Sequence, residues 1–156
     1  MTPEKIAAFK VDRTGWEAGP WDDEPDRVDF HHAGFACLAL RNMTSGHWCG
    51  YVGVPSSHPD YKRDYNDLNV DCHGDLTYGS ACDGEHICHV PQPGEPDDLF
   101  WFGFDCHHCW DIAPGTLMYD KKYGFDRGRD PMSSYRTLAY VRKQIESLAE
   151  QLSPRA

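Results

Sequence analysis

The stretch Leu99–Asp111 carries the side chains best suited to chemistry. It begins with apolar and aromatic residues, which are typical of a buried strand. The sequence then changes within one residue to Asp105, followed by cysteine, histidine and a further aspartate, whose side chains bind metals and transfer protons. Because a rigid strand would deliver these side chains to one place, we predict a chemical site at its end.

A second polar group lies upstream in Asp71-Cys-His73. A strand over Leu68–His73 would place Asp71 and His73 on one face, because side chains alternate with a period of two. If this strand neighbours the first, its histidine reaches the same site. The set could hold a hydrolytic metal that activates water, or it could act without metal through a histidine base that an aspartate orients. The predicted catalytic residues are His73, Asp105, His108 and Asp111.

Seven cysteines and nine histidines in 156 residues make a metal the leading cofactor hypothesis. In a reducing compartment the cysteines are expected to be thiols or ligands instead of disulfides. A C-x5-C pair and a C-x2-C pair suit a tetrahedral structural zinc site, in which a nearby histidine could replace one thiolate. The other three cysteines lie within predicted strands and are expected to be small buried residues. The predicted Zn²⁺ ligands are Cys82, Cys88, Cys106 and Cys109.

Aromatic residues on the predicted strands could wall a ligand pocket beside these sites. Trp48, Tyr51 and Tyr78 are the residues that we predict to bind a nucleobase or another planar ligand. Packing in the hydrophobic core is the alternative interpretation of the same residues.

The elements that must position these residues fit one domain over residues 1–156. Phe35–Met43 and His47–Val54 predict an antiparallel hairpin. A helix over 131–152, capped by Asp130, has one apolar stripe that suits packing across a sheet. Residues 79–98 and 114–129 are expected to be long loops. The predicted fold class is α+β, with a mainly antiparallel sheet, a long C-terminal helix packed on it and long loops.

The first 30 residues are interpreted as an acidic, tryptophan-containing arm. Thr2 and Pro3 predict a short helix at its start. The acidic run that follows Pro20 is expected to be a solvated face, with Trp16 and Trp21 pinning the arm to the core.

The formal net charge of −10 bears on possible partners. Phosphate backbones would repel a chain this acidic, so direct nucleic-acid binding is not expected. A host protein or a small nucleotide-like ligand held through a metal stays compatible with this charge. The sequence contains no apolar run of the roughly 20 residues that a membrane helix needs, and its first residues lack the features of a signal peptide. We therefore expect a cytoplasmic protein.

Four segments taken together resemble an uncharacterised family of small phage- and prophage-encoded proteins. The resemblance covers nearly the whole chain and implies a bacterial cytoplasm, with modulation of the host as one role; it supplies no activity. In the family pattern one histidine and one aspartate follow Phe-Asp-Cys, so that His107 and Cys109 are additions here. This implies a metal set of Cys82, Cys88, Cys106 and a histidine. The segments are Gly19–Asp26, Trp48–Val54 with His58-Pro59, His73–Tyr78, and Trp101–Cys106 with His108 and Asp111.

These observations support two functional hypotheses. The first is a small metal-binding protein, with zinc as the metal, that binds a small ligand or a host partner in a cleft lined by histidine and aspartate. The alternative is a metal-dependent hydrolase of a phosphoester or nucleotide-like substrate. No complete catalytic signature decides whether the chain is an enzyme.

Overall fold

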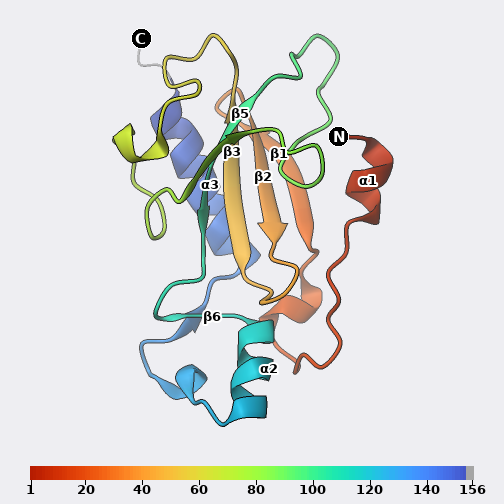
Figure 1. Ribbon diagram of the computed structural model, residues 1–156, viewed down its shortest axis with the longest axis vertical. Helices are drawn as coiled ribbons and strands as arrows, with labels where there is room; N and C mark the ends of the chain where they lie inside the picture. Colours follow the sequence, from red (N-terminus) through yellow and green to blue (C-terminus); the bar gives the residue numbers. More distant parts are fainter. Residues whose placement is uncertain (154–156) are drawn as a thin grey trace.

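The computed structural model describes residues 1–153 and has the predicted α+β architecture (Figure 1). A five-stranded sheet has the order β1-β2-β3-β5-β4, and every neighbouring pair in it is antiparallel. A separate parallel pair, β6 and β7, lies beyond one end of the sheet. The sheet strands are β1 (Arg27–His32), β2 (Phe35–Arg41), β3 (Trp48–Val54), β4 (Tyr78–Ala81) and β5 (Phe100–Asp105); the others are β6 (Asp111–Ile112) and β7 (Ser134–Tyr135).

The helices are short except at the C-terminal end. The N-terminal helix is confirmed, because the Thr2 side chain accepts a hydrogen bond from the Lys5 amide at 3.2 Å. The α-helices are α1 (Pro3–Ala8), α2 (Pro114–Tyr123) and α3 (Leu138–Leu152); single 3-10 turns are η1 (Pro20–Asp23), η2 (Tyr65–Asp67) and η3 (Arg127–Arg129).

The main hydrophobic core lies between α3 and one face of the sheet. Trp48, Phe102 and Ile145 are fully buried in it. Gly50 allows the helix to approach β3 closely, because a Cβ there would lie 2.6 Å from Cγ1 of Ile145. The apolar stripe of the C-terminal helix therefore packs across the sheet as predicted.

The opposite face of the sheet is covered by irregular segments instead of a helix. Leu38 and Trp101 are fully buried there, and Phe9 and Ile87 pack on their cluster. Arg27 fixes the covering loop by donating hydrogen bonds to two of its backbone carbonyls at 2.6 and 2.7 Å. A disulfide closes the same loop.

The C-terminal helix begins later than the sequence predicts. Asp130 does not cap it, but accepts a hydrogen bond from the Met132 amide within a turn. Residues 134–135 then pair with β6, which interrupts the apolar periodicity. The cap is Thr137, whose side chain accepts from the Tyr140 amide, and Glu24 accepts from the Leu138 amide at 2.5 Å. The predicted start at residue 131 is therefore wrong.

The predicted strand over residues 68–73 is also wrong. Leu68 and Val70 pack against the core as expected for apolar positions. The backbone of Asp71, however, is bonded at both N–H and C=O by the Gln151 side chain on α3, at 2.7 and 2.8 Å. A helix side chain thus satisfies polar groups that a strand would satisfy in a ladder.

The loop predicted over 114–129 contains α2. Pro114 occupies the first turn of this helix, and Gly124 ends it in the left-handed conformation at φ 76°. This order of proline and glycine is a helix signal that the sequence does contain. The first strand likewise begins inside the predicted arm, at Arg27.

The acidic run after Pro20 is not simply a solvated face. Asp22 and Asp23 are exposed, but the side chains of Glu24 and Asp26 are only 12% and 9% exposed and pair with buried Arg41. Trp21 is buried, as predicted for a residue that pins the arm. Among the described residues, no helix has the length and apolar character required to cross a membrane.

Candidate functional site

The candidate site lies where β5 ends and the chain continues toward β6, below the sheet in Figure 1. Asp105 is the last residue of β5, and Asp111 is the first of β6. His108 lies in the turn between them, which the Asp111 amide closes by donating to the His108 carbonyl at 3.0 Å. His73 arrives from the segment before β4. The four residues that the sequence predicts as catalytic therefore lie together.

His73 and Asp111 form the centre of the site. The Nε2 atom of His73 is 2.7 Å from a carboxylate oxygen of Asp111. Its other ring nitrogen is 2.8 Å from the hydroxyl of Tyr140 on α3. With both ring nitrogens engaged, the imidazole has one orientation.

Asp111 is the most buried member, with a side chain that is 2% exposed. Burial raises the pKa of this carboxyl, but hydrogen bonds from His73, Arg136 and the His108 amide outweigh it and hold the pKa below its ordinary value. The Arg136 Nε donates at 2.9 Å to the oxygen that His73 does not contact. Asp111 is therefore a carboxylate at neutral pH.

His108 is the exposed member of the site. Its Nε2 lies 3.0 Å from the Asp105 carbonyl oxygen and 3.4 Å from the Asp105 carboxylate. Gly74 packs against its ring: a Cβ at this position would collide with the imidazole, and the backbone is left-handed at φ 66°. The Gly74 turn thus allows His73 and His108 to approach each other.

His73, His108 and Asp111 could hold a metal ion. Each offers one ligand atom, and the three atoms lie within 4.8 Å of one another. Asp105 lies beside this group and is fixed by Thr77, whose hydroxyl donates to its carboxylate at 3.0 Å. Two imidazoles and a carboxylate are a donor set that transition metals prefer.

The structure does not assemble the predicted four-cysteine zinc site. Cys82 and Cys88 are joined to each other in a disulfide, with Cα atoms 4.9 Å apart, which removes two of the four thiolates. Cys106 is a buried thiol, and burial raises its pKa. Cys109 is free and exposed. The expectation that all seven cysteines are thiols or metal ligands is therefore wrong for Cys82 and Cys88.

The three predicted ligand-binding aromatic residues do not line one pocket. Trp48 is fully buried under α3, whereas Tyr51 and Tyr78 pack on the opposite face of the sheet. Tyr51 and Tyr78 meet edge to face at 5.4 Å between ring centroids, and both lie opposite Gly103, where a side chain would displace Tyr51. Core packing accounts for all three.

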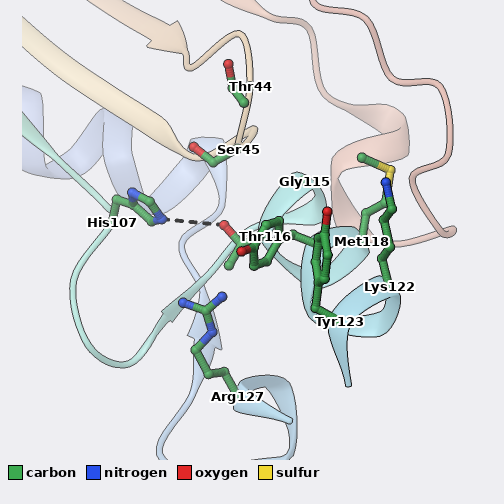
Figure 2. Close-up of a pocket in the computed structure, with 10 residues that line it drawn as sticks. Thr44, Ser45, His107, Gly115, Thr116, Met118, Lys122, Tyr123 and Arg127 are labelled. Carbon is green, nitrogen blue, oxygen red and sulfur yellow. Dashed lines mark hydrogen bonds between the residues drawn. The ribbon is translucent and has the colours of Figure 1, made fainter. Parts of the chain in front are cut away.

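A cavity of about 490 Å³ lies next to the site and was not foreseen from the sequence (Figure 2). It is formed by α2, the turn at Thr44 and Ser45, and His107. A second cavity, of about 380 Å³, contains His108 and Asp111 in its wall. The two share His107, Thr116 and Arg127, so that the hollow extends from the site toward α2.

Tyr140 and Arg136 are further site residues that sequence reasoning missed. Both lie in residues 131–152, which the sequence predicts to form a helix that packs across the sheet. Their spacing gives no signal, because their role depends on the contact of this segment with the turn after β5.

Comparison of the chain with protein-family models, curated protein sequences and solved structures finds no match.

Proposed function

We propose that this chain is a zinc-binding protein whose metal is held by His73, His108 and Asp111, and that the adjoining cleft binds a small ligand. The proximity of the three ligand atoms, within 4.8 Å of one another, carries the proposal. The ligand set differs from the cysteine set that the sequence predicts.

The surroundings of the ligands suit a metal. Histidines that bind metals commonly have the second ring nitrogen fixed by a hydrogen bond, as Tyr140 does for His73. Arg136 fixes one oxygen of Asp111 and leaves the other directed at His73. Since Asp111 is already ionised, metal binding there requires no loss of a proton from it.

A hydrolase is the second candidate function, and the open side of the site favours it. Two histidines and a carboxylate leave a coordination position free for water, as in catalytic zinc sites. The cavity of about 380 Å³ reaches His108 and Asp111 and gives a substrate access. Zinc bound there would supply a water molecule of lowered pKa. Asp105, which lies beside His108, would orient this water or accept its proton. The substrate would be a phosphoester or a nucleotide-like molecule.

The resemblance to small phage-encoded proteins supports a biological setting for either candidate. We propose that the chain acts in a bacterial cytoplasm and that its acidic surface, with a net charge of −10, meets a host protein.

Titration of the metal-free protein with Co²⁺ tests the metal site, because cobalt reports its ligands in the visible spectrum. We expect one ion per chain, a spectrum without thiolate charge transfer, and competition by Zn²⁺. His108→Ala should weaken binding by at least tenfold, as expected when a ligand is lost. His31→Ala is the matched control, because His31 is an exposed histidine on β1.

Two results would contradict the proposal. Unchanged affinity in His108→Ala would exclude this ligand set, and loss of binding in Cys109→Ser would return the site to the cysteines. Hydrolysis of a generic phosphomonoester that requires zinc and disappears in His108→Ala would support the hydrolase over a binding role.

A further inference from the structure

The cavity on α2 is lined by both cationic and aromatic side chains. We propose that it binds a nucleoside monophosphate, with the phosphate at Arg127 and Lys122 and the base against Tyr119 and Tyr123. This inference rests on the proposed function, since it names the ligand of the cleft beside the candidate metal site, but it can be tested without metal.

The size and position of the cavity give the first argument. A volume of about 490 Å³ is in the range of cavities that hold small organic ligands. Figure 2 shows Arg127 directed toward His107 and Thr116, which are themselves 3.4 Å apart between Nε2 and the hydroxyl. Because these three residues also border the cavity at His108 and Asp111, a phosphate beside Arg127 would face the candidate metal site.

The charge of the cavity gives the second argument. The chain as a whole is strongly acidic, yet this cavity contains two cations. Buried Asp120 pairs with the Nε and Nη2 side of Arg127, which fixes the guanidinium and leaves Nη1 without a partner among the described residues. Lys122 likewise has no carboxylate partner in residues 1–153, whereas its neighbour Lys121 is paired with Glu17 at 2.7 Å. The Lys122 ammonium lies 5.4 Å from the centroid of the Tyr123 ring. A fixed guanidinium and an ammonium without a carboxylate partner are well suited to a phosphate.

The aromatic residues give the third argument. Tyr119 and Tyr123 line the cavity, and their ring centroids are 4.6 Å apart. Each is more than half exposed, which is unusual for two adjacent large aromatic side chains. Phe125 lies parallel to Tyr119 at 6.2 Å and extends the same surface. Such faces stack on nucleobases without requiring a particular base.

Calorimetric titration of the full chain with AMP tests this assignment, with adenosine and inorganic phosphate as the two partial ligands. We expect AMP to bind in the presence of a chelator, and each partial ligand to bind on the order of tenfold more weakly. Lys122→Gln and Tyr123→Ala alter exposed positions and should each weaken AMP binding about tenfold. Lys121→Gln is the matched control for the first and should change nothing.

Arg127→Gln should have the largest effect, on the order of a hundredfold. Thermal melting of this variant checks its folding, because the substitution leaves Asp120 unpaired. If its melting temperature is lowered, Lys122→Gln and Tyr123→Ala decide the test. Absence of AMP binding at millimolar concentration, or equal binding by Lys122→Gln, Tyr123→Ala and the unaltered chain, would overturn the assignment.

The proposed metal site and this ligand site can fail separately. AMP binding that depends on Tyr123 in a protein that binds no cobalt would reject the metal site and keep the ligand site. Cobalt binding through His108 without AMP binding would do the reverse.

Discussion

The layer between α3 and the sheet is buried, and so is the region at the end of the sheet beside β6 and β7. The two regions differ in the chemistry of their side chains. Beneath α3 the contacts are apolar, and regular elements supply nearly all of them. At the end of the sheet, Glu24, Asp26, Arg41, Asp111 and Tyr135 form what we call the polar end. Its charged and hydroxyl groups come from four separate segments of the chain.

Arg41 organises the polar end. Its side chain is fully buried, pairs with Asp26 at 3.0 Å and with Glu24 at 3.2 Å, and donates to the Tyr135 hydroxyl at 2.9 Å. It also lies over the Trp48 ring at 4.4 Å from the centroid. Because Tyr135 belongs to β7, which pairs with β6, this network also places Asp111 and Arg136 in the candidate site.

The two regions should respond differently to substitution. An apolar layer loses stability in proportion to the volume removed. A network of buried charges depends on every member, because one missing partner leaves another charge unpaired in a region of low dielectric. Damage to the polar end should therefore reach the site, whereas damage beneath α3 should not.

Replacement of Arg41 should produce the largest loss. Arg41→Met leaves Glu24 without its paired cation and Asp26 with only the partly exposed Arg13, and we expect the free energy of unfolding to fall by about 3–5 kcal/mol. Urea denaturation measures this change, and cobalt titration should show weaker metal binding in the same variant. The exposed pair of Arg63 and Asp60 provides the control, since Arg63→Met should cost about 1 kcal/mol or less. An equal loss of free energy of unfolding in both variants would show that Arg41 does not organise the polar end.

A cavity beneath α3 should cost somewhat less. Ile145→Ala removes a fully buried side chain that packs on Gly50, and we expect a loss of about 3 kcal/mol in the free energy of unfolding. Cobalt affinity should remain unchanged, because the apolar side chain of Ile145 takes no part in the hydrogen bonds that orient the candidate ligands. Lys143→Ala, on the exposed side of the same helix, should change stability by less than about 0.5 kcal/mol. Weaker cobalt binding in Ile145→Ala would remove the distinction between the two regions.

Acid should destabilise the folded chain through His47, which is buried. Burial, with a smaller contribution from His107 stacked on it at 4.4 Å, lowers the pKa of this histidine to about 4. The unfolded chain therefore takes up this proton below about pH 6.5 while the folded chain does not, so stability falls as the pH drops toward 4 and no further below it.

Urea denaturation at pH 7 and pH 5 measures the contribution of His47 to the free energy of unfolding. We expect the unaltered chain to lose on the order of 2 kcal/mol more than His47→Gln over this range. His31→Gln, at an exposed histidine, should follow the unaltered chain. Parallel pH profiles for the unaltered chain and His47→Gln would contradict a neutral, buried His47.

The apolar half of the molecule was accessible to prediction because its signals are local. The hairpin of β2 and β3, the strand β5 and the stripe on α3 each repeat with the period of their own element. The same reasoning placed a strand over residues 68–73, where Gln151 takes the backbone bonds instead. The same pattern predicts a start of the C-terminal helix seven residues too early. An apolar stripe does not show that residues 134–135 form β7 and that Thr137 caps the helix.

The sequence predicts which residues form the candidate site, but not how the fold brings them together. Proximity along the chain indicates Asp105, His108 and Asp111, and the expected strand over Leu68–His73 indicates His73. They meet through a left-handed turn at Gly74 and not through neighbouring strands. The cysteine spacing suggested zinc, but spacing cannot distinguish thiolate ligands from a disulfide, since both need only closeness.

Residue type and period alone determine which residues are apolar, where β2, β3, β5 and the body of α3 form, and which side chains can do chemistry. The tertiary structure decided which polar groups meet: Tyr140 with His73, Arg136 with Asp111, and Arg127 with the cavity on α2. Directional hydrogen bonds and charges act over a few ångströms, and only the folded chain brings such distant residues within that range.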